Sequence, residues 1–325
     1  MVTKRDVAVK AGVSTATVSR VISGQGYVSG EAEKKVLRAI DELKYIPNKL
    51  ASNLAKKESN VIAVLVEDLL NPYYMHLVDA MVERAAEKNY IVSLFALKNR
   101  KVKCVLDDLA TNRVCGIVNL AMFTCDFSAY DVFIESGTRL INCTNADPSV
   151  VVDYEPGMME ALQLLHEKGC RDVAFISGLE EWLTYKDRRV NCYLNNLERF
   201  GFTRDERLLL SGNYPKEKAH KVGYELCEQL LQSGVRFDSI FCLTDMMSLG
   251  VMKALYDHGY KIPEDVSIIG SDNLDFAHDF HPALTTIDVD KKAEGYAYVD
   301  FILGECDQEI VKIKTKLVVR DSVKK

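Results

Sequence analysis

The sequence predicts an α/β protein with a small helical domain at its N-terminus and a core of two doubly wound subdomains built on parallel sheets. Three observations point to this fold class. The first 44 residues have the pattern of two short helices around a glycine-containing turn, and the rest alternates apolar runs of strand length with amphipathic helices. The third observation is length, because 325 residues exceed what one hydrophobic core usually serves.

The N-terminal segment has the features of a helix-turn-helix motif. We expect one helix over 3–9 and a second over 14–21, separated by a tight glycine turn. Thr3 and Ser14 are suited to cap these helices, because each side-chain oxygen can accept from amides of the first turn. A third helix, with apolar residues at helical spacing over 29–43, is needed to cover the apolar faces of the first two.

The second helix keeps a face with nothing apolar to bury. That face carries Thr15, Ala16, Thr17, Ser19 and Arg20. Small hydroxylated side chains let a helix lie deep in the major groove of DNA, where hydroxyls and methyl groups meet base edges and an Arg can bind a guanine. The alternative interpretation is an ordinary three-helix surface whose Ser and Thr serve only solubility.

The segment that follows favours the DNA interpretation. Pro47 disfavours helix at the residue before it and so ends the third helix, and residues 48–54 can form about two further turns. A helix this short is marginal in water by itself. We therefore expect residues 45–59 to be a hinge and linker that folds only when a twin segment and a DNA groove hold it.

These residues carry a family resemblance. Residues 2–54, in particular AGVSTATVSRV and YIPNKLASNL, resemble the DNA-binding head and hinge of the LacI/GalR family of bacterial transcription repressors, and the resemblance extends along almost the whole chain. It implies that Thr15 and Ala16 set operator preference, with Arg20 assisting. It also implies that Leu54 is inserted between base pairs from the minor groove. The residues predicted to contact DNA are Thr3, Ser14, Thr15, Ala16, Thr17, Ser19, Arg20, Asn48, Ala51 and Leu54.

Charge is divided unevenly along the chain. The first 60 residues hold eight Lys, three Arg and six acidic residues, a net charge of +5, so the total of −6 leaves −11 on the remainder. A basic head on an acidic body is the asymmetry expected when one end of a protein meets phosphate. A solvated lysine-rich face would give the same count, but it explains less where a helix-turn-helix pattern covers the same residues.

Composition also bears on compartment and cofactors. The nine cysteines are scattered among apolar stretches and form no Cys-x-x-Cys pair, which favours reduced thiols over a disulfide framework or a zinc site. The sequence shows no signal-peptide pattern and no apolar run approaching the ~18 residues of a membrane span. We expect a cytoplasmic protein without a cofactor and without membrane attachment.

After residue 60, apolar runs of strand length alternate with amphipathic helices. The expected strands are residues 61–66, 91–97, 116–120, 138–143, 173–177, 208–210, 239–242 and 267–269. The expected helices are residues 74–88, 102–111, 156–168, 189–200, 216–232 and 246–258. Strands that are apolar throughout indicate parallel sheets covered on both faces, and two successive sets of about five suggest two similar subdomains. Ligands of such folds bind at the carboxyl ends of strands, here in a cleft between the sheets.

The resemblance refines this core to a periplasmic-binding-protein-like architecture with crossed connections. The implied boundaries are 60–155 with 287–312 for the first subdomain, and 156–286 with 313–325 for the second. A helix over 290–304 would return to the first subdomain, and a terminal strand near 313–320 to the second. Crossovers near Asp153, Thr286 and Lys314 would form the hinge.

Polar and aromatic residues at predicted strand ends are the candidates for a small-molecule site. Residues 68–74 follow the first strand and resemble the family's Asn-Pro-aromatic-aromatic turn, and Asp272 matches the family's ligand-binding Asp. Arg189 occupies the family's effector-binding Arg position, where a guanidinium can bridge two neighbouring hydroxyls or a carboxylate. The predicted effector-binding residues are Asn71, Tyr73, Tyr74, Trp182, Arg189, Asp245 and Asp272.

Four of the seven candidates have a structural alternative. The alternatives are dimer-interface packing for Tyr74, a surface salt bridge for Arg189 or its neighbour Arg188, a helix cap for Asp245 and a loop anchor for Trp182. Cys192 stands where the family usually has Gly, which bears on packing beside Arg189. His278 and His281 fit a loop before Pro282 better than a metal site, because no Cys or carboxylate pattern completes one.

Together these features predict a DNA-binding transcription repressor. A homodimer would place two heads on a pseudo-palindromic operator. An effector in the cleft would change the affinity for DNA to the extent that its own affinity differs between two arrangements of the subdomains. A sugar or sugar phosphate is the expected effector, and a purine or nucleoside is the alternative. A stand-alone receptor fits poorly with the DNA-binding head. An enzyme fits poorly with a sequence that has no nucleophile elbow, dinucleotide fingerprint or metal motif.

Overall fold

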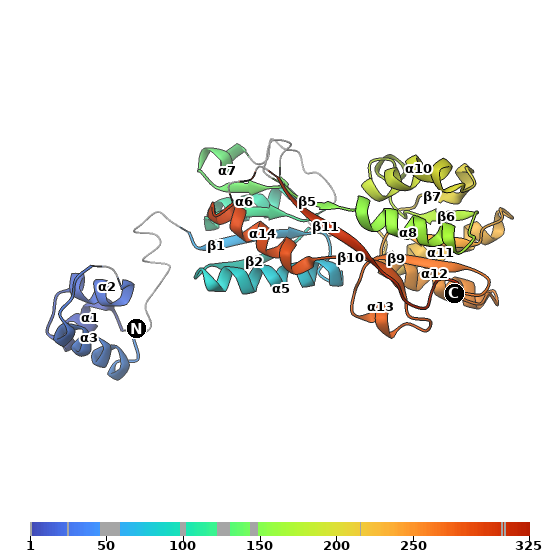
Figure 1. Ribbon diagram of the computed structural model, residues 1–325. Helices are drawn as coiled ribbons and strands as arrows, with labels where there is room; N and C mark the ends of the chain where they lie inside the picture. The colour runs from blue at the N-terminus through green and yellow to red at the C-terminus, as the bar shows by residue number, and fades with distance from the viewer. Residues whose placement is uncertain are drawn as a thin grey trace. The chain divides into compact units, whose positions relative to one another are not determined.

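The computed structural model describes residues 2–24, 26–45, 59–97, 102–121, 131–143, 149–214, 216–306, 308 and 310–325 (Figure 1). Contacts divide the chain into two compact units, Met1–Ser59 and Asn60–Lys325. The predicted hinge helix, with Asn48, Ala51 and Leu54, lies outside the described residues.

The N-terminal unit is a three-helix head. Its helices are α1 (Lys4–Ala11), α2 (Thr15–Ser23) and α3 (Gly30–Glu42). The predicted caps are confirmed: the hydroxyl of Thr3 accepts from the amide of Asp6 at 3.4 Å, and that of Ser14 accepts from the amide of Thr17 at 3.1 Å. Gly24, at φ 66°, ends α2 at Ser23 rather than at the predicted residue 21. The buried core of the head consists of Val7, Ala8, Ala11, Val18, Val36, Ala39 and Tyr45.

The first lobe of the larger unit is a four-stranded parallel sheet in the order β2-β1-β3-β4. Its strands are β1 (Val61–Val66), β2 (Ile91–Ala96), β3 (Gly116–Asn119) and β4 (Arg139–Ile141), and its helices are α5 (Pro72–Glu87), α6 (Val102–Asn112), α7 (Asp131–Glu135) and α14 (Lys291–Leu303). Leu77 of α5 and Val299 of α14 bury one face against Val64, while Leu109 of α6 packs with Leu65 on the other. Helices on both faces explain why the strands are apolar throughout.

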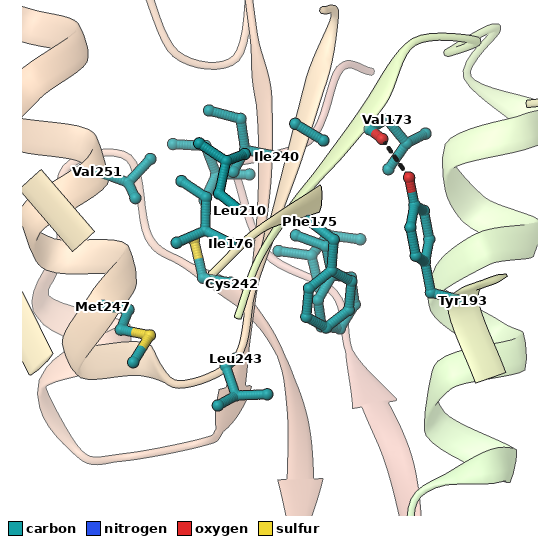
Figure 2. Packing of buried hydrophobic residues seen from close by; sticks show 14 of the residues in the cluster. Val173, Phe175, Ile176, Tyr193, Leu210, Ile240, Cys242, Leu243, Met247 and Val251 are labelled. Carbon is teal, nitrogen blue, oxygen red and sulfur yellow. Dashed lines mark hydrogen bonds between the residues drawn. The ribbon is translucent and has the colours of Figure 1, made fainter. Parts of the chain in front are cut away.

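The second lobe is a seven-stranded sheet in the order β5-β11-β10-β9-β8-β6-β7. Its strands are β5 (Ser149–Asp153), β6 (Val173–Ile176), β7 (Leu209–Leu210), β8 (Ser239–Cys242), β9 (Ser267–Asp272), β10 (Thr285–Val289) and β11 (Ile310–Val318). Its helices are α8 (Glu155–Glu167), α9 (Glu181–Thr184), α10 (Arg188–Phe200), α11 (Ala219–Gln232), α12 (Asp245–Asp257) and α13 (Phe276–Asp279), with the 3-10 helix η2 (Glu206–Leu208). Phe175 and Phe241 stack at 5.1 Å in the core. On the α10 side, Tyr193 donates to the carbonyl of Val173 at 2.7 Å (Figure 2).

The sheets differ from the expected two sets of about five parallel strands. Among the described residues they hold four and seven strands, and β11 pairs parallel with β5 but antiparallel with β10. That expectation was wrong because a strand joins the sheet that offers it hydrogen-bond partners, not the one nearest in sequence. β5 follows β4 along the chain, yet it pairs with β11.

Three strands join the lobes to each other. β5, β10 and β11 belong to the second sheet, but they contribute Val150, Val289 and Ile313 to the apolar cluster of the first lobe. The chain therefore passes between lobes from β4 to β5, from β10 to α14 and from α14 back to β11, whose long ribbon runs from one lobe to the other (Figure 1). Asp153, Thr286 and Lys314, the expected crossover positions, lie in these three strands.

Other local features can be compared with the sequence. Within the described ranges, no helix is both long and apolar enough to cross a membrane. Eight cysteines fall in those ranges and all are free thiols, with Cys104 exposed and the others buried or half-buried. The predicted loop before Pro282 is wrong in part, because α13 occupies residues 276–279.

Candidate nucleic-acid interface and ligand cavity

The outer face of α2 presents the surface predicted to enter DNA. Thr15, Ala16 and Arg20 are exposed on it. The side chain of Arg20 lies against Gly26: a Cβ added to Gly26 would be 3.5 Å from the Cδ of Arg20. No residue in the described part of the head accepts a hydrogen bond from the Arg20 guanidinium, so its donors are available for a base edge or a phosphate.

The other hydroxyls of this surface are engaged within the head. The hydroxyl oxygens of Ser14 and Thr17 lie 2.9 Å apart, and the hydroxyl of Ser19 accepts from the ammonium of Lys4 at 2.9 Å. Thr3 is held in the capping box of α1. These side chains fix the two helices relative to each other, and they would reach DNA only by exchanging those bonds.

A cavity of about 320 Å³ lies between the two lobes of the larger unit. It is at the carboxyl ends of β1, β3 and β4 on one side and of β8 and β9 on the other, where ligands of α/β folds bind. Its volume is at the small end of the range of about 300–1,000 Å³ for ligand pockets. Its polar and aromatic lining consists of Asn71, Asn119, Asn142, Arg189, Thr244, Asp272 and Glu294 with Tyr73, Tyr74, Tyr154, Tyr214 and Tyr298.

Arg189 enters the cavity from the first turn of α10. Its guanidinium donates twice to Asp187, at 3.0 and 2.8 Å, and once to the carbonyl of Leu243 at 2.8 Å. It also lies over the ring of Tyr154, 4.6 Å from the centroid. Burial by itself would raise the pKa of Asp187, but the charge and hydrogen bonds of Arg189 hold that pKa below its ordinary value. Two of the five guanidinium N–H groups have no partner among the described residues, which leaves them for a ligand.

Two buried carboxyls face the same space. Burial, and then the neighbouring charge of Asp245, raises the pKa of Asp272 well above its ordinary value. Glu294 of α14 is 4% exposed, and its carboxylate accepts from the hydroxyls of Tyr73 at 2.7 Å and Tyr298 at 3.1 Å. Burial raises the pKa of Glu294 despite those two hydrogen bonds. Asp272 and Glu294 come from opposite lobes, so the cavity has hydrogen-bond acceptors on both walls.

Aromatic rings form much of the remaining surface. Tyr73 and Tyr74 meet edge to face, with ring centroids 6.0 Å apart. Asn71 caps α5 by accepting from the amide of Tyr73 at 3.0 Å, and it donates to the hydroxyl of Tyr214 at 3.3 Å. That second bond crosses from the first lobe to the second, so the predicted Asn-Pro-aromatic-aromatic turn lies at the junction of the lobes.

Both units match known protein families. Residues 3–48 match the model of bacterial regulatory proteins of the lacI family, and residues 162–323 match a periplasmic binding protein-like domain. The chain is 31% identical over 346 residues to the HTH-type transcriptional repressor PurR of Pasteurella multocida, an alignment that covers 100% of this chain and 99% of the relative. The chain belongs to the LacI family.

Solved structures of LacI-family proteins have the same architecture. The lac repressor dimer bound to operator and the anti-inducer ONPF matches with a TM-score of 0.83 and 26% identity, over 99% of this chain and 98% of that one. The complex of the transcriptional regulator CelR with cellobiose matches with a TM-score of 0.71 and 26% identity, over 99% and 100%. The chain is therefore a DNA-binding repressor with an effector-binding core, and the predicted fold class is confirmed. The expectation that it is not an enzyme is also confirmed, because its relatives are transcriptional repressors.

Five of the seven predicted effector residues line the cavity of this LacI-family core, and Asp245 is not one of them. Its side chain is fully buried and accepts from the hydroxyl of Thr286 at 2.6 Å and from the amide of Leu274 at 2.8 Å. It does not cap α12 either, because Thr244 does. Asp245 instead holds the turn that follows Asp272.

Trp182 also lies away from the cavity. The residue is 52% exposed and its indole N–H donates to Glu180 at 2.8 Å, which fits the loop-anchor alternative. Arg188 is exposed, so of the two adjacent arginines only Arg189 enters the cavity. The side chain of His278 is 80% exposed. No cluster of three potential metal ligands occurs within the residues the structure describes.

The sequence interpretation missed the contribution of α14. Glu294 and Tyr298 lie four residues apart on that helix and both line the cavity. A usable signal was present, because Tyr298, Val299 and Ile302 are spaced as one apolar face of a helix, and Glu294 falls on the same face. A Glu on a buried helix face is itself buried, and buried carboxyls are paired or functional.

Proposed function

We propose that this repressor responds to a small, uncharged polyhydroxy compound, a sugar first of all, that binds in the cavity between the lobes. The observation that carries the proposal is the set of acceptors and donors facing one another there: Arg189 and Asp272 from the second lobe, Glu294 from the first. A ring with neighbouring hydroxyls can donate to both carboxyls and accept from the guanidinium at once. The cellobiose bound by the related regulator CelR supports a carbohydrate effector.

The charges of the cavity favour a neutral sugar over a sugar phosphate. The positive charge of Arg189 is already balanced by Asp187, at 2.8 Å. Asp272 and Glu294 make no ion pair among the described residues, and burial raises the pKa of both. Arg189 is the one cation on the described lining of the cavity, so a phosphate would be buried without a free counter-charge, whereas neutral hydroxyls need none.

A purine or nucleoside is the second candidate. Five tyrosines line the cavity, and Tyr73 and Tyr74 form an edge-to-face pair at its first-lobe wall. Aromatic side chains of this kind stack on flat rings. A nucleoside would combine a base for that surface with ribose hydroxyls for Asp272.

The proposed mechanism assigns a role to each segment. Residues 1–44 form the head, residues 45–59 the hinge, and residues 60–325 the effector-binding and dimerisation core, in which 60–155 with 287–312 and 156–286 with 313–325 are the two subdomains. A homodimer would bind a pseudo-palindromic operator, as the operator-bound lac repressor dimer supports. The effector would shift the DNA-binding equilibrium by its differential affinity for two arrangements of the lobes.

Thermal melting of the full-length protein tests this proposal. The panel contains neutral sugars, phosphates of the same sugars, purines and nucleosides. A compound at a hundred times its Kd stabilises by about 2.7 kcal/mol, which should raise the Tm by about 5 °C. Asp272→Asn is expected to abolish the shift, whereas Asp279→Asn, whose side chain is 81% exposed outside the cavity, should keep it.

Two outcomes would contradict the proposal. One is a panel in which only phosphorylated compounds stabilise the protein, and the other is an equal shift in the wild type and Asp272→Asn. A hit must also change affinity for an operator duplex obtained by selection from random DNA.

A further inference from the structure

The turn after β9 holds two successive residues in a conformation that L-amino acids rarely adopt. Asp272 has φ 120° and Asn273 has φ 48°. Asn tolerates the left-handed region, but φ 120° is strained for Asp272, and the strain persists only where surrounding contacts hold it. Because Asp272 faces the cavity, its backbone conformation sets the direction of its carboxyl.

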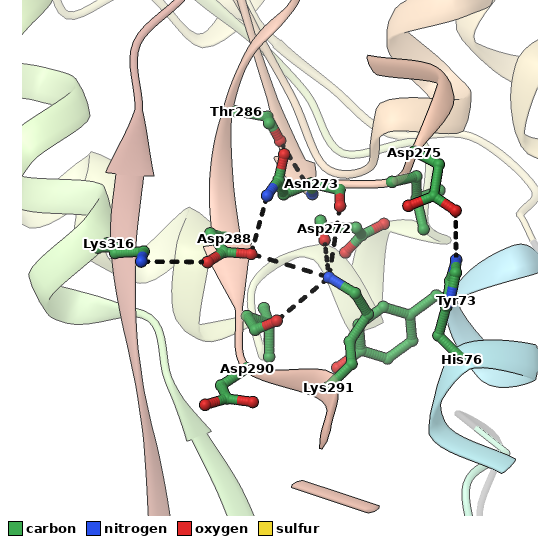
Figure 3. A network of polar contacts seen from close by, with 12 residues as sticks. Tyr73, His76, Asp272, Asn273, Asp275, Thr286, Asp288, Asp290, Lys291 and Lys316 are labelled. Atoms are coloured by element: carbon green, nitrogen blue, oxygen red, sulfur yellow. Dashed lines mark hydrogen bonds and ion pairs between the residues drawn. The ribbon is translucent and has the colours of Figure 1, made fainter. Parts of the chain in front are cut away.

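Lys291 makes the contacts that hold this turn (Figure 3). Its ammonium donates to the carbonyl oxygens of Asp272 at 2.6 Å, Val289 at 3.1 Å and Asn273 at 3.4 Å, and it lies 3.8 Å from a carboxylate oxygen of Asp288. An ammonium has three N–H donors, and these three carbonyls can take all of them. The side chain is only 15% exposed, so water competes little for the bonds.

Lys291 belongs to the lobe opposite the turn that it holds. It is the first residue of α14, which packs so closely on α5 that a Cβ at Gly295 would lie 2.8 Å from the carbonyl oxygen of Leu77. The same helix carries Glu294 on the first-lobe wall of the cavity. Through Lys291, the position of Asp272 is tied to the helix that carries Glu294.

Other contacts of the turn do not provide the same link. The side-chain amide of Asn273 donates to Asp288 at 3.0 Å and accepts from Arg320 at 2.7 Å, but neither partner lies on α14: Asp288 is in β10 of the second sheet and Arg320 follows β11. A second contact from the first lobe joins His76 to Asp275 at 3.7 Å (Figure 3). The Asp275 side chain is 92% exposed, and an ion pair so open to water contributes little.

We propose that Lys291 is a positioning residue that couples the effector site to the first lobe. It fixes Asp272 at a set distance from Glu294, so that a compound bound between the two carboxyls moves α14 together with the turn. The inference rests on the proposed function, because it takes Asp272 to bind the effector. Lys291 does not line the cavity and acts through Asp272.

Hydrogen exchange in the full-length protein tests the positioning role without a ligand. In Lys291→Met, the amides of Asn273 and Leu274 are expected to exchange at least about tenfold faster than in the wild type. Lys291→Arg keeps several donors and should restore much of the protection. The matched control is Lys292→Met, because Lys292 is 62% exposed and pairs with Glu83 of its own lobe. Equal exchange in the wild type and Lys291→Met overturns the proposal.

Binding separates coupling from simple support of the turn. The probe is the sugar or nucleoside that gives the largest Tm shift in the panel, measured by calorimetry and by its effect on operator affinity. Lys291→Met is expected to weaken probe binding about tenfold or more and to reduce the operator response, with Lys291→Arg intermediate and Lys292→Met unchanged. Faster exchange with a normal probe affinity and operator response would overturn the coupling role. A panel without a hit refutes the proposed function instead, and the exchange result still decides whether Lys291 holds the turn.

Discussion

Asp187 and Arg189 stand two residues apart at the start of α10 and are largely removed from water, with side chains 12% and 8% exposed. A similar Asp-x-Arg pair occurs on the surface, where Asp205 caps η2 and binds Arg207, whose side chain is 65% exposed. A buried ion pair gains little by forming, but removal of one partner leaves an uncompensated charge. Comparison of the two pairs therefore isolates the effect of burial.

Asp187→Asn is expected to lower the free energy of unfolding of the core by about 3–5 kcal/mol, because it leaves the Arg189 guanidinium buried without a counter-charge. Denaturant titration of the full-length protein measures this loss. The control is Asp205→Asn, which removes the same interaction in contact with water and should change stability far less. A loss at Asp187 no larger than that at Asp205 would refute the argument from burial.

The buried carboxyls predict an unusual dependence of stability on pH. Burial raises the pKa of Asp245 to about 7, although the bonds from Thr286 and Leu274 lower it, and burial also raises the pKa of Asp272 and Glu294. Between pH 4 and 7 the folded protein keeps protons that the unfolded chain has released. The stabilisation that these protons give is therefore greatest at the low-pH end of this window, and it is lost as the pH rises through the pKa of the folded state.

Denaturant titrations at pH 5, 6, 7 and 8 measure this effect. Each retained proton lowers the free energy of unfolding by up to about 1.4 kcal/mol for every pH unit by which the pH rises. Carboxyls with lowered pKa are ionised in both states above pH 5 and do not oppose the trend. Asp245→Asn should flatten the profile, and a wild-type core that is equally stable at pH 5 and pH 8 would show that the buried carboxyls are not protonated.

Among the elements, the contact of α11 with α12 depends on glycine. A Cβ at Gly250 of α12 would overlap the carbonyl oxygen of His220, and one at Gly223 of α11 would overlap that of Met247. Helix backbones approach this closely only where a side chain is missing. The pair of glycines thus sets the distance between two helices that cover the second sheet.

Gly250→Ala is expected to destabilise the core by about 1–3 kcal/mol or more, because the helices must separate. Gly30→Ala is the control, since nothing lies within 4 Å of a Cβ in the first turn of α3, and a helical Ala for Gly gains up to about 1 kcal/mol. Thermal melts of both variants decide the matter. A Gly250→Ala core as stable as the wild type would show that the contact relaxes without cost.

Continuously apolar strands were predictable from the sequence, whereas a strand with polar residues and the short helices were not. The strand over 61–66 and the strand over 239–242 appear as predicted, because continuous apolar runs are strong signals. β10 was missed because its Thr285 and Thr286 look polar in sequence. Both are fully buried, since their hydroxyls bond to the amide of Arg320 and to a buried carboxyl. α7, α9 and α13 span only four or five residues, too few for periodicity to show.

In the molecule as a whole, the head carries the DNA-binding surface and the core carries the proposed effector site, and the hinge segment is proposed to link them. Leu54→Ala is expected to weaken binding to the selected operator much more than binding to random DNA, because an inserted side chain acts only where the operator is kinked. Fluorescence anisotropy at fixed salt concentration compares the two. An equal loss on both DNAs would exclude the proposed insertion.

The candidate site was predictable only in part at this scale. Arg189 and Asp272 could be placed from strand ends and family resemblance, but the partnership of Asp272 with Glu294 could not. The family resemblance implied that the helix after β10 returns to the first lobe, but no local pattern specifies which of its side chains lies in the cavity. The same limit hid the role of Lys291, whose partners become neighbours only in the complete fold.

The return of α14 to the first lobe also affects how the protein is made. Ile62, Val64 and Val118 of the first sheet pack in one cluster with Val299 and Ile302 of α14. During synthesis, β1, α5 and β3 leave the ribosome long before α14 does. α5 can cover part of this face early, but the part that Val299 and Ile302 cover stays open until the residues beyond β10 have emerged. The first lobe is therefore begun first and finished after most of the second, and the open part of its sheet is exposed apolar surface of the kind that makes folding intermediates prone to aggregate.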